Sequence, residues 1–485
     1  MGTVFSLSAT IFQQPIAELS HVLGRKPAFL LVLAVFALGS IVAGTANNMA
    51  VLLLGRGMQG FASGGSVLAA IVLSDLIAVK DRATWIAYQN ATQALGLRWL
   101  FYVNLPAIAI SGTGLWYFLG FDRPQGTMAE NLLKADWLGI TIFIPSAVAF
   151  LSPLTMAGVL YEWKSCKALV PLLTGLLGLV VLAAHQRFWA RHPMFRAVVF
   201  EEPAVVCALF GLTVFGLCVN MIFYYLVVFW SGVKGLNEIL TGVALLPETL
   251  TIPIAAILCG AYMRLSNQIH WAMRFGWPLS TLSLGLLWFL DDKTPLWGLI
   301  VINIGVGFGA GMVSPALHLT ILAATEKKIN GHATAMAYLF KSAGMCLGVA
   351  LGTAVFTMQM TAHFNGVEAG QKMNAESMLQ MLKEVKSDPN SMDAIIQTLR
   401  ILWMLCCALS GVAGTLCNLC KYPPVAGDPS IAAAMTESNV LAEKDSPKPS
   451  THLTSFGDSC FRGSSSTSIK PSVDLPQQAQ RRSSS

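Results

Sequence analysis

Long apolar runs recur along the first 420 residues of the chain. A helix that crosses about 30 Å of hydrocarbon needs about 20 apolar residues, so runs of this length predict membrane spans. Eleven runs qualify, at residues 27–46, 49–73, 99–121, 136–157, 168–188, 202–230, 239–262, 271–290, 295–323, 332–360 and 399–420. Residues 1–17 form a shorter apolar start, and residues 84–97 form a weak, polar fragment. The pattern predicts an all-α polytopic membrane protein with about 11 to 13 spans.

Basic residues gather in alternate loops between the runs, as cytoplasmic loops of membrane proteins do. The basic loops contain Arg25 and Lys26, Lys80 and Arg82, Arg123 and Lys134, Arg187, Arg191 and Arg196, Arg264 and Arg274, and Lys327 and Lys328. The loop 361–398 instead carries five acids against three lysines, which indicates the opposite side. Loops 74–83 and 122–135 are both basic, yet only one full span lies between them. We therefore expect a defective or missing span near 84–97.

The composition excludes a soluble protein. Only 12% of the 485 residues are charged, 54% are hydrophobic, and the mean hydropathy is +0.61. A soluble domain carries roughly 25% charged residues. The net charge of +6 is spread too thinly to indicate a nucleic-acid partner. Residues 421–485, rich in Ser, Pro and Gln, predict a disordered cytoplasmic tail.

Residues 15–26 resemble the signature loop between the second and third helices of the major facilitator superfamily. The pattern Gly-x-Leu-x-Asp-x-x-Gly-Arg-Lys/Arg is matched at Leu19, Gly24, Arg25 and Lys26, with Ala17 for Gly and His21 for Asp. Gly24 permits a tight turn, and the two cations anchor the loop in the cytoplasm. An ordinary positive-inside loop is the alternative interpretation.

Residues 54–60 (LGRGMQG) resemble the fourth-helix motif of the same family, in which the arginine is associated with proton coupling. An arginine inside a span is costly and has to face the bundle interior or a wet cavity. Arg56 is therefore a proton-coupling candidate, and Gln59 is a candidate for the substrate cavity. The alternative is an arginine that snorkels from a helix end.

Four further segments resemble the fourteen-helix drug:proton antiporter branch: residues 98–106, 136–139, 224–226 and 242–247. Two departures stand out. The signature loop arrives after so few residues that we expect the family's first helix to be missing. The fifth-helix motif Gly-x-x-x-Gly-Pro-x-x-Gly-Gly is also absent, at the place where the span count fails. Either the gene model skips a segment or the chain is a truncated family member.

Several polar residues inside apolar runs are site candidates. Glu248 and Lys341 are proton-coupling candidates, because a carboxylate or an amine inside the membrane is a functional candidate by default. His318, Tyr224 and Tyr225 are candidates for the substrate cavity. As alternatives, Glu248 is a carboxylate with a structural hydrogen bond, and His318 is a core histidine whose hydrogen bonds are satisfied. The two tyrosines would then belong to an aromatic belt at the membrane interface.

The resemblance implies the major facilitator fold, with two helical bundles around a central cavity and alternating access about a midplane site. We expect an incomplete amino-terminal bundle at 1–121, two linker spans and a cytoplasmic loop at 122–201, a carboxy-terminal bundle at 202–420, and the tail. The implied function is export of a small amphipathic or hydrophobic compound (a drug, toxin or secondary metabolite) by proton antiport. An uptake carrier of the same fold and a transport-inactive remnant are the alternatives.

The remaining expectations concern partners and place. We expect a monomer in the plasma membrane, with the vacuolar membrane as the alternative, whose partners are protons, lipid and a small molecule. No cofactor, metal or nucleic acid is predicted. An integral membrane enzyme is disfavoured, because the sequence shows no His-rich metal cluster, nucleophile elbow or paired carboxylates at a span end.

Overall fold

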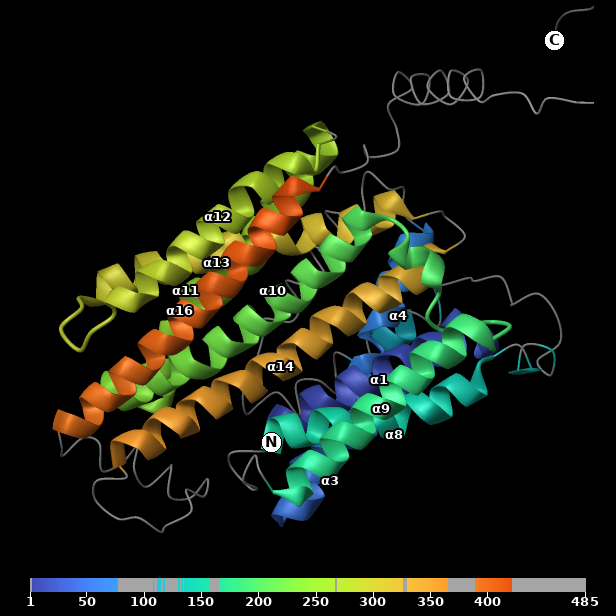
Figure 1. Ribbon diagram of the computed structural model, residues 1–485, viewed down its shortest axis with the longest axis horizontal. Coiled ribbons are helices and arrows are strands. Elements are labelled where there is room, and N and C mark those ends of the chain that lie inside the picture. The colour runs from blue at the N-terminus through green and yellow to red at the C-terminus, as the bar shows by residue number, and fades with distance from the viewer. Residues whose placement is uncertain are drawn as a thin grey trace, which may run out of the picture. The chain divides into compact units, whose positions relative to one another are not determined.

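The computed structural model describes residues 2–76, 135–156, 165–266, 268–325, 329–364 and 389–420, with a few isolated positions between 108 and 133. Within these residues every regular element is a helix (Figure 1). The first six long helices are α1 (Gly2–Leu23), α2 (Arg25–Gly44), α3 (Met49–Gly64), α4 (Ser66–Leu76), α8 (Trp137–Met156) and α9 (Cys166–Phe188). The others are α10 (Pro203–Val228), α11 (Glu238–Ser266), α12 (His270–Leu286), α13 (Leu296–Ala324), α14 (Asn330–Phe364) and α16 (Pro389–Leu419). Short 3₁₀-helices occupy Ala197–Phe200 and Leu287–Phe289, and a π-helix occupies Phe229–Val233.

Eight helices of the described residues are long and apolar enough to cross a membrane: α2, α8, α9, α10, α11, α13, α14 and α16. Their outer faces carry large exposed hydrophobic side chains. On α9, for example, Leu173, Leu177 and Val180 are all more than half exposed. Exposing such an apolar surface to water is unfavourable, whereas contact with lipid costs little free energy. The predicted all-α polytopic membrane fold is confirmed.

The amino-terminal end differs from the sequence prediction. Residues 2–17 belong to α1, a continuous helix of 22 residues that runs through Pro15. Neighbouring helices tolerate a proline inside a membrane helix. The predicted signature loop is therefore mostly helical and shrinks to Gly24, whose φ of 91° a residue with a side chain rarely adopts.

Two predicted span boundaries are wrong. The run 49–73 is interrupted at Gly65, where the backbone N–H donates to the Ala62 carbonyl and separates α3 from α4. A methyl group at Gly65 would lie 2.9 Å from Val32 Cγ2, so the break is also a close approach to α2. The last helix, α16, starts at Pro389 rather than near residue 399. Residues 84–97 and most of 99–121 lie outside the described residues.

The buried side chains form three clusters, and α14 contributes to all of them. The largest cluster lies among α10 to α16, the second among α1 to α4, and the third around α8 and α9. Met336, Tyr338 and Leu339 of α14 belong to the first, second and third cluster respectively. In Figure 1, α14 (orange) runs alongside α10 and also meets the helices of the blue and teal set, and contacts link it to α1, α4 and α8. α14 therefore packs against both sets of helices, α1 to α9 and α10 to α16, which we call the amino-terminal and carboxy-terminal halves.

Candidate functional site

Two of the predicted site residues, Lys341 and His318, meet between α10, α13 and α14. The Lys341 Nζ lies 5.6 Å from the centroid of the Phe215 ring on α10, within cation–π range. His318 on α13 is only 2% exposed, and its ring packs edge-on against Tyr338 of α14 with 5.0 Å between ring centroids. Lys341 follows Tyr338 by three residues on α14, so it lies about one helical turn from the ring that packs against His318.

The hydrogen bonds of His318 fix which ring nitrogen carries the proton. Its Nδ1 lies 2.8 Å from the Ser314 carbonyl oxygen, which can only accept. A neutral ring therefore carries its hydrogen on Nδ1, and Nε2 holds a lone pair. This Nε2 is buried and has no hydrogen-bond partner within the described part of the chain. The site can thus take up a proton, or a hydrogen bond from a ligand.

A polar contact between α1 and α14 lies beside Lys341. The Thr10 Oγ1 of α1 is 3.1 Å from the Ser342 Oγ and 3.3 Å from the Cys346 Sγ, both on α14. Thr10 is 2% exposed. Sequence reasoning missed this contact, because an isolated threonine in an apolar run carries no distinguishing signal. The contact places the Lys341 site at the junction between the two halves.

Glu248 lies elsewhere in the bundle. It is 1% exposed on α11, and its Oε2 has no hydrogen-bond partner among the described residues. A methyl group at Gly307 of α13 would lie 2.7 Å from the Glu248 carbonyl oxygen, so this residue packs at the level of Gly307. His318 follows Gly307 by three helical turns, which is about 16 Å along the axis. The structure therefore does not bring Glu248 together with Lys341 and His318.

Asn303 of α13, a polar residue near the level of Glu248, was not predicted from the sequence. Asn303 is 1% exposed, and its Oδ1 has no hydrogen-bond partner within the described residues. It precedes Gly307 by one helical turn. An asparagine that is buried in an apolar run could have been flagged by the same rule that selected Glu248.

Arg56 and Gln59 belong to the packing of α3 against α2. The Arg56 Nη1 donates to the Gln59 Oε1 at 3.5 Å, and the Gln59 Nε2 donates to the Ser40 Oγ of α2 at 2.9 Å. Gln59 is 2% exposed. This chain of hydrogen bonds explains why a glutamine is tolerated at a buried position, and it orients Arg56 from one side.

Tyr224 and Tyr225 point in different directions, because consecutive helical residues are about 100° apart. Tyr225 is 2% exposed and packs against Phe356 of α14, with 5.7 Å between ring centroids. Tyr224 is 48% exposed. One turn before it, the Asn220 Nδ2 donates to the Met345 carbonyl of α14 at 2.7 Å. Only Tyr224 of the predicted pair is open to a ligand, since Tyr225 is part of the α10–α14 packing.

The signature turn lies against the first turn of α14. A methyl group at Gly331 would be 3.7 Å from the Arg25 Nη2. His21, which stands where the family pattern has Asp, stacks on His332 of α14 with 4.9 Å between ring centroids. The His332 Nδ1 is 3.8 Å from the Glu18 Oε1. Gly24, Arg25 and Lys26 thus join α1 to α2 next to a second contact between the halves.

Asp136 holds the start of α8. Its Oδ1 accepts from the Gly139 backbone N–H at 2.8 Å, and its carboxylate also contacts His185 and Gln186 of α9. This is the helix-capping role of an aspartate, joined to a link between α8 and α9. Groups of three metal-ligating side chains are absent from the residues that the structure describes.

Comparisons with known proteins agree with this architecture. The family model described as Major Facilitator Superfamily matches residues 1–349, which is more than half of the chain. The MFS transporter L2 of Phoma sp. is 32% identical over 449 residues, covering 85% of this chain and 73% of the relative. The MFS efflux transporter aclA of Aspergillus oryzae is 27% identical, covering 73% of this chain and 68% of the relative.

A solved structure supports the fold. The human organic anion transporter MFSD10 (TETRAN) superimposes with a TM-score of 0.52 at 15% identity, covering 84% of this chain and 82% of that one. The family match and the apolar helices together make the chain a multi-pass membrane transporter rather than an enzyme. The chain belongs to the Major Facilitator Superfamily.

Proposed function

We propose that this transporter exports a small amphipathic or hydrophobic compound in exchange for protons. The observation that carries the proposal is the buried His318, whose ring packs against Tyr338 one helical turn before Lys341, next to the Thr10–Ser342 contact of α1 and α14. The relative from Aspergillus oryzae, whose name describes an efflux transporter, supports export as the direction. The antiporter branch suggested by the sequence motifs supports the exchange for protons.

The geometry suggests how a proton could drive the cycle. The open Nε2 of His318 can accept a proton, and the resulting imidazolium would share one buried site with the Lys341 ammonium. Two like charges repel strongly where water is excluded. The repulsion acts between α13 and α14, and opening of the α1–α14 contact beside Lys341 lets water reach the site and screen the two charges. Protonation therefore favours this opening, whereas deprotonation favours the packed arrangement. A substrate that binds one of the two arrangements more tightly shifts the same equilibrium.

The other predicted residues remain candidates for proton coupling or for the substrate cavity. Arg56 and Glu248 remain proton-coupling candidates in separate parts of the protein, and Tyr224 and Gln59 remain cavity candidates. Residues 1–121 and 202–420 are proposed as the two moving bundles, with α8 and α9 as linker spans. The plasma membrane is the proposed location.

Proteoliposomes that enclose a pH-sensitive dye test the proton step. The purified full-length protein is supplied with a set of fluorescent amphipathic cations, including rhodamine 6G, and proton movement is followed on dye addition. His318→Gln should abolish proton movement while leaving dye exchange without a gradient intact. His192→Gln, at an exposed loop position, is the matched control and should behave like the parent protein.

Two results would count against the proposal. Unchanged proton movement in His318→Gln would show that this residue does not carry the coupling. Dye movement by the parent protein without proton movement, at every imposed pH gradient, would exclude antiport. If the parent protein moves none of the compounds in either direction, the transport-inactive remnant becomes the better description.

A further inference from the structure

A groove lies on the outer surface of the carboxy-terminal helices, away from the site described above. Its floor is α13, which packs closely against both neighbours. A methyl group at Gly311 of α13 would lie 2.7 Å from the Ala255 Cβ of α11, and one at Gly276 of α12 would lie 3.1 Å from the Met312 Cβ of α13. These two approaches hold α11 and α12 on either side of α13 at the same level, so that their side chains form the walls.

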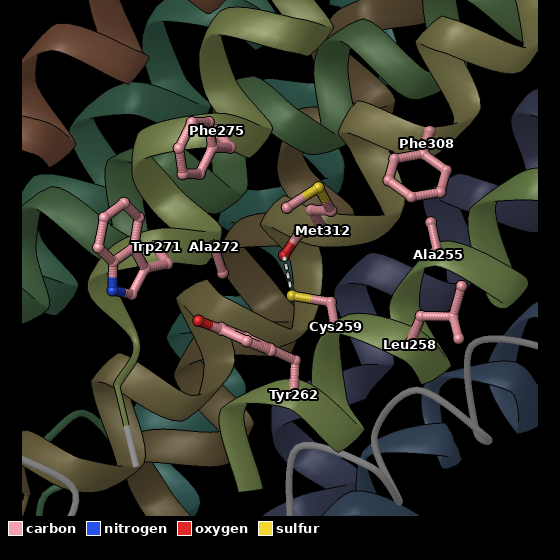
Figure 2. Close-up of a pocket in the computed structure, with 9 residues that line it drawn as sticks. All are labelled: Ala255, Leu258, Cys259, Tyr262, Trp271, Ala272, Phe275, Phe308 and Met312. Atoms are coloured by element: carbon pink, nitrogen blue, oxygen red, sulfur yellow. Dashed lines mark hydrogen bonds between the residues drawn. The ribbon is translucent and has the colours of Figure 1, made fainter. Parts of the chain in front are cut away.

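The groove has a volume of about 250 Å³ and is almost entirely apolar (Figure 2). Figure 2 shows Trp271 and Phe275 of α12 on one side, Leu258 of α11 on the other, and Met312 between them. The Trp271 and Phe275 rings stack with 5.5 Å between centroids and 8° between planes. Trp271, Phe275 and Leu258 are 40%, 57% and 58% exposed, and α11 and α13, which flank the groove with α12, are long and apolar enough to cross a membrane. The wall is thus a flat, rigid, apolar surface that opens to the bilayer.

Among the polar side-chain groups that line the groove, all but the Tyr262 hydroxyl make hydrogen bonds within the described residues. The Cys259 thiol donates to the Met312 carbonyl at 3.7 Å, which Figure 2 marks with a dashed line. The Trp271 indole N–H donates to the Gln268 Oε1 at 2.6 Å. The Tyr262 hydroxyl has no hydrogen bond within the described residues, and this side chain is 50% exposed. The groove therefore offers one hydroxyl at the edge of an apolar, planar surface.

The sequence of α11 adds an independent observation. Leu258, Tyr262 and Arg264 fit the pattern Leu/Val-x₁₋₅-Tyr-x₁₋₅-Lys/Arg that has been suggested for sterol contact. The pattern is weak by itself. Here, however, two of its three residues line a groove of suitable chemistry, and the third is an exposed cation on the same stretch of helix. Arg264 and Arg274 place this end of the groove on the side predicted to be cytoplasmic.

We propose that the groove between α11 and α12 binds a sterol from the cytoplasmic leaflet, with its ring system against Trp271 and Phe275 and its hydroxyl at Tyr262. A sterol matches the groove because it has one hydroxyl on a rigid, flat, apolar body. Its rings lose little conformational entropy on binding, whereas a phospholipid chain loses the freedom of many rotatable bonds. The hydroxyl finds a donor or acceptor in Tyr262 at the depth where aromatic side chains meet the interface.

Photolabelling tests the site directly. The full-length protein is reconstituted in phosphatidylcholine vesicles with a diazirine analogue of cholesterol, irradiated and digested. Label should map to the groove segments of α11 to α13, and Phe275→Ala should lower it by about fivefold because half of the stacked wall is lost. Trp297→Ala removes a 71% exposed aromatic residue at the other end of α13 and is the matched control. It should not change labelling.

Competition separates a sterol from other occupants. Unlabelled cholesterol should displace the label from the parent protein more strongly than cholestane, which lacks the hydroxyl. In Tyr262→Phe, which keeps the ring and removes only the oxygen, the two competitors should become equal. Equal labelling of Phe275→Ala and Trp297→Ala would overturn the proposal. Displacement by phosphatidylserine as strong as that by cholesterol would also overturn it, and would assign the groove to a phospholipid.

Discussion

The packing of α10 against α14 leaves no room for a side chain at Gly348, and replacing this residue by alanine measures how tightly the two helices are joined. The added methyl would lie 2.5 Å from the Leu217 carbonyl oxygen, whereas ordinary contact begins at 3.4 Å. The helices must therefore move apart by about 0.9 Å. The obstacle is main chain, so no side chain can rotate away to make room.

Such overpacking costs about 1–3 kcal/mol. The gain in helix propensity from Gly to Ala, about 1 kcal/mol, offsets part of this cost. We therefore expect Gly348→Ala to lower the free energy of unfolding by up to about 2 kcal/mol. Gly242→Ala is the matched control, because a methyl group at Gly242 of α11 meets nothing within 4 Å. That variant should gain the propensity without the clash and be as stable as the parent protein or more so.

Thermal unfolding of the detergent-purified protein checks both expectations. A maleimide dye that becomes fluorescent on reaction with thiols reports the exposure of buried cysteines such as Cys218 and Cys406. The melting temperature should fall for Gly348→Ala and should stay level or rise for Gly242→Ala. If Gly348→Ala melts at or above the temperature of Gly242→Ala, the close packing of α10 and α14 is not what stabilises this half.

Three further predictions concern polar contacts. Gln59→Leu removes the donor to the Ser40 Oγ, which keeps the bond that it donates to the Phe36 carbonyl, and should lower the free energy of unfolding by about 0.5–1.5 kcal/mol. An unchanged denaturation midpoint would show that the contact does not contribute to stability. Asp136→Ala removes the cap of α8 and should cost about 0.5–2 kcal/mol in the same measurement, with Asp136→Asn milder. Thr10→Val weakens the α1–α14 contact by about 0.5–1.5 kcal/mol and should speed maleimide labelling of Cys346 severalfold; an unchanged rate would argue against opening at this contact.

The sequence predicted the helices well because the membrane imposes a single requirement on every span. About 20 apolar residues in a row have few alternatives to a helix. Its errors lie where local backbone conformation decides the boundary. The break at Gly65, directly after the end of α3, falls in the only Gly-Gly pair of the run 49–73, a turn signal that hydropathy alone does not register. Residues 15–26 resemble a loop, yet α1 continues to Leu23.

The candidate site was harder to predict because polar residues were chosen one at a time. The rule that a buried ionisable group is functional selects Glu248 and Lys341 equally, but it gives no depth or neighbour. The structure separates these two residues and places Lys341 one helical turn from Tyr338, whose ring packs against His318. Pairs such as Thr10 and Ser342 are 332 positions apart, and hydropathy contains no information on which helices meet.

The glycines between α10 and α14 differ in whether a second mutation could relieve the clash that an alanine would cause. At Gly348 the neighbour is the backbone of Leu217, so no substitution at a second position creates space, and a lineage that acquires alanine there keeps its cost. At Gly352 the neighbour is the ring of Tyr225, so a smaller residue at 225 could compensate. In homologues of this helix pair, we therefore expect substitutions at Gly352 to occur together with a smaller residue at position 225. At Gly348 we expect no compensated substitution.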